Sequence, residues 1–295
     1  MKIAYVDRKF APQTLETISQ AGSIVEEYQA QDLSLTLRQL YYQFVARGYL
    51  ANSDKSYKRL SSVLSDARRA GLIDWEAIED RTRYLRQQTR WTSPAEILKS
   101  AVSSYHKDLW TNQACRVEVW IEKDALVGVI DEVCRRYDVP YFSCRGFVSD
   151  SEMWRAGYER IHKDNGQAAQ WLIILHLGDH DPSGVDMSRD IRDRLTLFSN
   201  GGYLQVERIA LTMEQVRQLN PPPNPTNLDD SRASDYVAKF GTSSWELDAL
   251  NPTYLRDLVE KHIIRWRNET LWNEAVKQQE DERQSLAALV DDAKS

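Results

Sequence analysis

The stretch WLIILHLGDHDPSGVDMSRD, residues 171–190, decides the fold that we expect for this chain. It begins with a continuous apolar run, which is typical of a central strand in a parallel sheet. It leads into a helix predicted over 182–198, because Met187, Ile191 and Leu195 recur on one helical face. A strand that runs directly into a helix is the unit from which α/β domains are built.

The same alternation of strand and helix continues on both sides of this stretch. Strands are predicted at 116–122, 139–145, 170–177 and 203–211. Helices are predicted between them, at 124–137, 149–161 and 182–198. This rhythm predicts an α/β domain with a four-stranded parallel sheet flanked by helices.

Two amphipathic helices are predicted upstream of the sheet. The first lies within 34–50 and carries apolar residues at helical spacing: Leu37, Tyr41, Phe44 and Val45. Ser34 or Thr36 can cap it, and Gly48 can end it. The second lies within 56–71, with an apolar stripe of Tyr57, Leu60, Leu64 and Ala67 and a closing Gly71. Two short helices, the second of them basic, indicate a winged helix-turn-helix.

The charge is unevenly distributed. The whole chain has a formal charge of −6, but residues 35–90 hold 11 Lys and Arg against 6 Asp and Glu. The local excess of +5 predicts a contact with a polyanion such as double-stranded DNA, although a solvated helical face explains it equally well. The candidate DNA-binding residues are Lys58, Arg59, Arg68 and Arg69.

The length of 295 residues suggests two principal domains. The predicted division is 1–33 as an N-terminal segment, 34–91 as the winged-helix domain, 92–114 as a connection, 115–219 as the sheet domain and 220–295 as a helical extension. Thr92-Ser93-Pro94 is a plausible helix start, 220–226 a rigid proline-rich loop, and the chain from Tyr254 onward one long polar helix.

No apolar run of 18 residues and no apolar leader is present, so no membrane partner is expected. The three cysteines, at 115, 134 and 144, have no metal-binding spacing and are expected to be reduced thiols. These features predict a cytoplasmic protein, which would be nucleoid-associated if the expected polyanion is DNA.

Three carboxylates follow the ends of predicted strands. Glu122 follows the first strand, and Asp179 and Asp181 follow the third. If those strands are neighbours, the three side chains meet at one sheet edge, where like charges require a cation. Oxygen ligands suit Mg²⁺, with Mn²⁺ as an alternative. An Asx turn or a helix cap could account for one aspartate instead. We expect His180 to face solvent.

A Glu that ends one strand and an Asp-x-Asp that ends a later strand resemble the Toprim domain. Five motifs in order resemble the topoisomerase VI A subunit and its meiotic double-strand-break relatives: LRQLYYQF at 37–44, IEKDAL at 121–126, CRGFVSDSE at 144–152, GDHDPSG at 178–184 and WELDAL at 245–250. His180 replaces a usual Gly. Because the chain is short and contains no ATPase motif, it looks most like the compact Mini-A type.

The resemblance implies a homodimer that cuts DNA, with a separate ATPase subunit as a possible partner. It places the nucleophile at Tyr42, which would become linked to a 5′ end. On the predicted helix Tyr42 lies about 140° from Leu37, whereas Tyr41 lies about 40° from it. We therefore expect Tyr42 to be exposed and Tyr41 to be buried with an idle hydroxyl. Arg38 is expected to stabilise the phenolate or to grip the phosphate.

Three functions compete at this point. The first is Mg²⁺-dependent cleavage of DNA by the tyrosine. The second is hydrolysis by a Toprim nuclease similar to the nuclease subunit of Wadjet plasmid-defence systems, in which water attacks. The third is a DNA-binding module without catalysis, which the three carboxylates disfavour.

Overall fold

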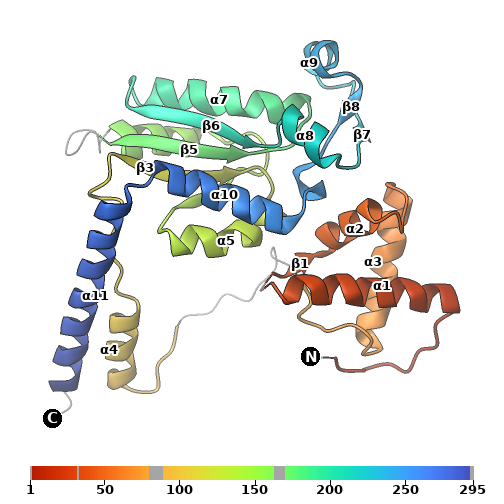
Figure 1. The fold of residues 1–295 in the computed structure, drawn as a ribbon, viewed down its shortest axis with the longest axis horizontal. Coiled ribbons are helices and arrows are strands. Elements are labelled where there is room, and N and C mark those ends of the chain that lie inside the picture. Colours follow the sequence, from red (N-terminus) through yellow and green to blue (C-terminus); the bar gives the residue numbers. More distant parts are fainter. Residues whose placement is uncertain (1, 32, 80–88, 163–169, 293–295) are drawn as a thin grey trace.

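The computed structural model describes residues 2–31, 33–79, 89–162 and 170–292 (Figure 1). Its centre is a four-stranded sheet of β3 (Cys115–Ile121), β4 (Tyr141–Ser143), β5 (Trp171–Leu177) and β6 (Leu204–Ala210). The order is β4-β3-β5-β6, and every pairing is parallel. The mixed α/β class and the four-stranded parallel sheet are thus confirmed.

Helices cover both faces of the sheet, because the strands are apolar on both faces. Val117, Val119 and Ile121 of β3 pack in one core cluster with α5 (Val127–Arg136) and α10 (Pro252–Trp266). Trp120 packs on the opposite face with α7 (Pro182–Phe198). Figure 1 shows α7 above the sheet and α5 and α10 below it.

Shorter helical turns complete these connections. The 3-10 turn η1 (Asp124–Leu126) leads into α5, and α6 (Asp150–Trp154) continues into a π-helical stretch, η2 (Arg155–His162). The helix α7 begins at the predicted residue, because Asp181 caps it and Pro182 occupies its first turn.

A helical N-terminal unit lies beside the sheet. It consists of α1 (Pro12–Gln29), α2 (Leu37–Ala46) and α3 (Asp54–Arg69), with a short parallel pair of β1 (Leu35–Thr36) and β2 (Ile78–Glu79). Both predicted amphipathic helices are present, capped by Thr36 and Ser53. The helix α1 was not predicted, and its buried face shares one core with α2 and α3.

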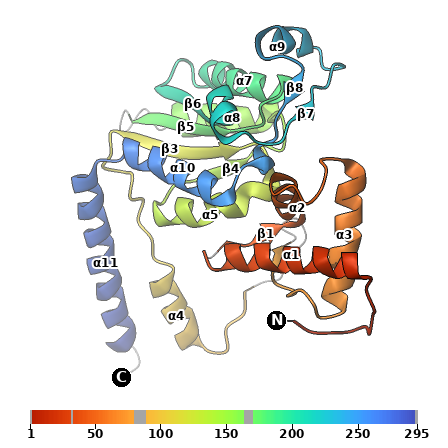
Figure 2. The same cartoon turned by 45° about the vertical axis from the view of Figure 1, so that its right-hand side comes forward.

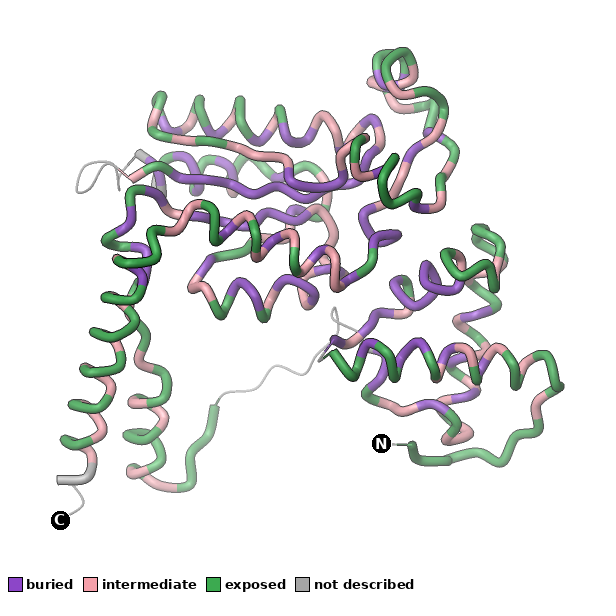
Figure 3. Tube along the Cα trace, in the orientation of Figure 1, coloured by how far each residue is buried: buried purple, intermediate pink, exposed green. Residues whose placement is uncertain are grey.

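The helix α2 is buried on almost every side, as Figure 3 shows. It contacts α1 and α3 on one side and the 3-10 turn η4 (Leu247–Ala249) on the other. Figures 1 and 2 both place α2 beside the segment that leads into α10. The helix α2, which carries Tyr42, therefore forms the side of the N-terminal unit that faces η4.

The remaining elements extend from both ends of the sheet. They are α4 (Pro94–Ser103), α8 (Met213–Leu219), β7 (Asn224–Pro225), α9 (Ala233–Phe240), β8 (Ser243–Ser244) and α11 (Glu269–Asp292). The expected single C-terminal helix is two helices, α10 and α11, because the chain is extended at Arg267. Trp272 is buried in the core and anchors α11, which then packs along α4. Among the described residues, no helix has the length and apolar character to cross a membrane.

Candidate functional site

A tight turn after β5 forms the floor of the candidate site. Because β3 pairs with β5 in register, Glu122 lies beside Gly178 and Asp179. A Cβ atom at Gly178 would lie 2.9 Å from Oε2 of Glu122, and one at Gly184 would clash with the carbonyl of Asp179. The close approach therefore requires a glycine at Gly184, whereas a side chain at Gly178 would displace the carboxylate of Glu122. The turn holds its carboxylates at the carboxyl ends of the strands, as predicted.

The three predicted carboxylates lie at this edge, and each accepts a hydrogen bond from a backbone amide. Oε2 of Glu122 accepts a hydrogen bond from the Asp179 amide at 2.8 Å. Oδ1 of Asp179 accepts one from the Leu247 amide at 2.7 Å. Oδ1 of Asp181 accepts one from the Gly184 amide at 2.6 Å, as a helix cap. The alternative role of a cap is thus real for Asp181, but it uses one oxygen only.

Burial makes the charged forms of two of these groups costly. It is the largest cause that raises the pKa of Asp179, opposed by the charge of Lys123 and assisted by that of Glu122. Burial also raises the pKa of Glu122, and the charge of Asp181 adds to the effect. A cation at this edge would relieve both costs.

Arg208 on β6 supports the turn from beneath. Its guanidinium donates to the carbonyl oxygens of Gly178 at 2.9 Å, Asp179 at 2.5 Å and Gly184 at 2.6 Å. Burial lowers its pKa to about 10, against the raising effect of Glu122 and the two aspartates. Arg208 therefore fixes the turn and supplies positive charge. It was not predicted, because a single arginine in a strand of mixed polarity gives no motif.

Lys123 and the WELDAL segment contribute charges that the sequence analysis did not assign. Nζ of Lys123 lies 2.9 Å from Oδ2 of Asp179, 2.9 Å from Oε2 of Glu246 and 3.8 Å from Oδ2 of Asp248. Although burial opposes its charge, Asp179 and the two WELDAL acids raise the pKa of Lys123. These residues could have been found from the sequence, because they lie in the motifs at 121–126 and 245–250.

His180 does not face solvent, and that expectation was wrong. Its side chain is buried against Tyr236, Phe240 and Trp245. Nδ1 lies 2.8 Å from the Tyr236 hydroxyl, which also donates to the His180 carbonyl. Burial lowers the pKa of His180 to about 4, so the ring is neutral. The reason is the packing of α9 and β8 over the turn, which no local pattern reveals.

Tyr42 is buried with 3% of its surface exposed, so the expectation of a free tyrosine was wrong. The prediction assumed that α2 has one buried face, but η4 covers the other. Tyr41 is buried as expected, yet its hydroxyl is not idle, because it accepts a hydrogen bond from the Ser53 amide at 2.7 Å.

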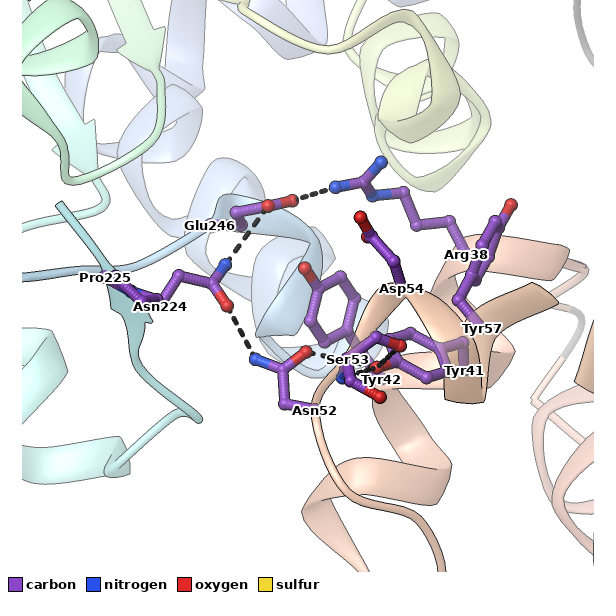
Figure 4. Close-up of a pocket in the computed structure, with 10 residues that line it drawn as sticks. All are labelled: Arg38, Tyr41, Tyr42, Asn52, Ser53, Asp54, Tyr57, Asn224, Pro225 and Glu246. Atoms are coloured by element: carbon purple, nitrogen blue, oxygen red, sulfur yellow. Dashed lines mark hydrogen bonds and ion pairs between the residues drawn. The ribbon is translucent and has the colours of Figure 1, made fainter. Parts of the chain in front are cut away.

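Tyr42 still borders a pocket between the N-terminal unit and the sheet (Figure 4). The pocket has a volume of about 400 Å³ and is lined by Arg38, Tyr41, Tyr42, Asn52, Ser53, Asp54, Tyr57, Asn224, Pro225 and Glu246. Arg38 lies over the Tyr42 ring at 5.9 Å. It also forms ion pairs with Glu246 at 2.5 Å and with Asp248 at 3.0 Å. The predicted pair of Arg38 and Tyr42 is therefore brought together.

The environment keeps the Tyr42 phenol neutral. Burial is the largest cause that raises its pKa to about 12, and the charge of Glu246 raises it further, while Arg38 lowers it. In this arrangement Tyr42 is a weak nucleophile, since a phenol attacks as phenolate.

Three of the four candidate DNA-binding residues on α3 are exposed, and the fourth is not. Lys58, Arg59 and Arg69 are exposed. Arg68 is partly buried, donates to the carbonyl of Trp75 and lies over that ring at 4.9 Å. Three of the four side chains are thus free to meet a phosphate backbone, whereas Arg68 is used within the fold.

The arrangement of these carboxylates bears on whether they can bind a divalent cation. Among the described residues, no group of three or more His, Cys, Asp or Glu side chains is arranged to hold a metal. Five carboxylates nevertheless face three cations, so this edge is rich in oxygen donors. The carboxylates are Glu122, Asp179, Asp181, Glu246 and Asp248, and the cations are Lys123, Arg208 and Arg38. Carboxylate oxygens are the type of donor that Mg²⁺ prefers.

Comparison with known proteins adds no relative. A scan against protein-family models finds no match, and a search of curated proteins finds none.

Proposed function

We propose that this protein cuts double-stranded DNA by transesterification, with Tyr42 as the nucleophile and a divalent cation at Glu122, Asp179 and Asp181. The observation that carries the proposal is the continuous chain of contacts from Asp179 through Lys123 and Glu246 to Arg38, which lies over the Tyr42 ring. A tyrosine on a helical unit and a carboxylate cluster on a sheet are thus coupled within one pocket.

The reaction exchanges one phosphoester bond for another. The Tyr42 oxygen forms a bond to phosphorus, and the bond to the 3′ oxygen breaks, which leaves a 5′-phosphotyrosyl link and a free 3′ hydroxyl. The phenolic proton is lost and the 3′ oxygen gains one, so no net proton is consumed. Bound Mg²⁺ or Mn²⁺ would stabilise charge on the phosphate oxygens. Arg38, once released from Glu246 and Asp248, would stabilise the phenolate or hold the phosphate.

The finer assignment follows from the same motifs. We assign 115–219 to a Toprim domain and 34–91 to a winged-helix domain, of which residues 80–88 lie outside the described residues. We propose that the protein is similar in function to the topoisomerase VI A subunit, in particular to its compact Mini-A type. We also propose that it is a homodimer, that it can have a separate ATPase subunit as a partner, and that its location is cytoplasmic and nucleoid-associated.

A hydrolytic nuclease is the second candidate, and the burial of Tyr42 favours it. In that reaction a water molecule attacks, so the tyrosine needs neither exposure nor a lowered pKa. The carboxylate cluster would serve both reactions.

One experiment separates the two. Supercoiled plasmid is incubated with protein and Mg²⁺, then denatured with and without protease treatment. Transesterification predicts cut DNA with protein bound to its 5′ ends, which enters the gel only after proteolysis. Hydrolysis predicts cut DNA with free ends in both samples. Intact plasmid under all conditions, with Mn²⁺ as well, would contradict both.

A further inference from the structure

An extended segment lies across the C-terminal end of α3. We call this segment, residues 2–10, the N-terminal arm. Ala4 forms an antiparallel bridge with Ala70, the residue that follows α3. The amide of Tyr5 donates a hydrogen bond to the carbonyl of Arg69 at 2.7 Å. Figure 1 shows the arm, in dark red, passing the end of α3 on its way to α1. The arm is therefore held against α3 by its main chain.

A glycine directly after α3 permits this close contact. Gly71 has a φ of +74°, a conformation that residues with a side chain rarely adopt. A Cβ atom at this position would also lie 2.8 Å from the backbone nitrogen of Ala4. The Trp75 indole adds a hydrogen bond to the carbonyl of Ile3 at 3.1 Å. The position of the arm is thus built into the fold and leaves its side chains available.

The arm places a cation on the exposed face of α3. Nη1 of Arg8 lies 2.6 Å from Oδ1 of Asp66. At about 100° per residue, Asp66 lies within about 60° of Arg59 and Arg69 around the helix, so these side chains share one face. Both arginines are exposed, and beyond its first residue α3 contains no other acid. Arg8 therefore compensates the one acid that would weaken this face as a site for an anion.

The cations of the arm remain accessible. Lys9 is exposed, and Arg8 keeps 51% of its side chain exposed in the pair with Asp66. An ion pair this exposed contributes little, so a phosphate can replace Asp66 as the partner of Arg8 at small cost. Residues 2–10 and 54–69 together hold 8 Lys and Arg against 3 Asp, an excess of +5 in a chain with a net charge of −6. This surface complements a polyanion.

The arm also exposes apolar side chains among these cations. Tyr5 is 69% exposed and Val6 is 49% exposed, and the Tyr5 ring meets the edge of Trp75 at 5.7 Å. In DNA-binding domains, extended basic arms beside a recognition helix lengthen the contact along the duplex. Apolar and aromatic side chains pack there on sugars and bases. The composition of the arm therefore favours DNA as its partner.

We propose that the N-terminal arm is a second DNA-contact element, which binds the duplex beside α3 through Arg8, Lys9 and Tyr5. The proposal rests on the proposed function for the nature of the partner, double-stranded DNA. It requires neither cleavage nor a bound metal. It extends the DNA surface beyond the helix α3 to a segment that the sequence left unassigned. A protein partner for Tyr5 and Val6 is the competing interpretation, and the excess of positive charge disfavours it.

The salt dependence of DNA binding tests the proposal without cleavage. Affinity for a short fluorescent duplex is measured in EDTA between about 50 and 200 mM salt. Arg8→Ala/Lys9→Ala should flatten the logarithmic dependence of affinity on salt by about 2, because two phosphate contacts are lost. The same flattening should remain in an Asp66→Asn background. If it disappears there, Arg8 only compensates the acid and the proposal is wrong.

Arg135→Ala/Arg136→Ala is the matched control. These adjacent arginines on α5 are 76% and 52% exposed, and each pairs with an acid one turn earlier. The control removes the same charge from a helix on the other side of the molecule's core, so the salt slope should stay as in the wild type. Equal slopes in the two double variants would mean that only the net charge matters. If Arg8→Ala/Lys9→Ala unfolds, Arg8→Gln/Lys9→Gln keeps more of the side chains and is measured in its place.

A chemical label tests whether the arm itself lies at the DNA. The cysteines at 115, 134 and 144 are buried, so an iron–EDTA reagent can be attached selectively to Lys9→Cys. The radicals that it forms should cut the bound duplex. Lys277→Cys, at an exposed position of α11, should give only the background of the free reagent. Cutting from Lys9→Cys that does not exceed this background would overturn the proposal.

The outcomes separate the arm from the cleavage mechanism. If Lys58→Ala/Arg59→Ala flattens the salt slope and Arg8→Ala/Lys9→Ala does not, α3 binds DNA and the arm proposal is wrong. If the arm variant flattens the slope but the wild type never cuts plasmid, the cleavage reaction is wrong and the arm contact stands. A wild type that binds no duplex at any of these salt concentrations contradicts both.

Discussion

Lys123 lies 2.9 Å from Asp179 and 2.9 Å from Glu246, so a single ammonium joins the turn after β5 to the segment before η4. This side chain is 20% exposed, and Asp248, which also faces it, is 1% exposed. Buried charges of this kind are costly when one partner is removed, because the remaining charges lose their compensation. The strength of this junction can therefore be measured by mutation.

Lys123→Met should lower the free energy of unfolding by about 3–5 kcal/mol, since it leaves buried carboxylates without their cation. Urea denaturation in EDTA measures the change. Lys107→Met is the matched control: Lys107 pairs with Glu282 at 2.8 Å at a more exposed position, and its loss should cost less than about 1 kcal/mol. Equal effects of the two variants would mean that the Lys123 junction is no stronger than a surface ion pair.

Tyr42→Phe should abolish the covalent DNA product if the tyrosine attacks. Tyr41→Phe should retain it, at a cost of about 1 kcal/mol in the free energy of unfolding, because the Ser53 amide loses its acceptor. The plasmid assay with protease and thermal denaturation measure the two effects. Full cleavage with free ends by Tyr42→Phe would select hydrolysis.

Asp179→Asn should make the metal-free protein more stable at pH 8. Burial is the main cause that raises the pKa of Asp179 in the folded state, so folding binds a proton between the unfolded and folded pKa values. Stability is therefore lost as pH rises through that interval. The neutral Asn escapes this loss, so its advantage over the wild type should shrink toward pH 4. Melting temperatures in EDTA across this range test the sign, and an advantage that grows at low pH would contradict it.

Replacing Lys58 and Arg59 together by Ala should flatten the logarithmic dependence of DNA affinity on salt by about 2. Both side chains are exposed on α3, so the fold should be unaffected. Arg68→Ala should act differently: it should leave the salt slope unchanged and lower stability, because Arg68 contacts Trp75. DNA binding measured between low and moderate salt decides between these outcomes. An unchanged slope in the double variant would mean that the basic face of α3 is solvated and does not contact DNA.

The elements that were predicted correctly are those marked by a local, periodic residue pattern. The apolar β5 and the helix capped at Asp181 are local patterns, and both are found where expected. The burial of Tyr42 was not predictable in this way, because Tyr42 is covered by η4, about 200 residues further along. The same holds for Glu246: its partners are fixed by tertiary packing, and a single carboxylate in a short motif does not reveal them.

The packing of Trp272 has a consequence for synthesis on the ribosome. The core beneath the sheet draws on residues from Leu109 to Trp272, so its last ring is supplied by α11, the last of the described helices. The core of α1–α3 needs only residues 18–78, apart from Ala249. Because nascent domains fold as their residues emerge, the helical unit can form early. The side of α2 that η4 covers in the complete fold then stays exposed until the chain around η4 has been translated.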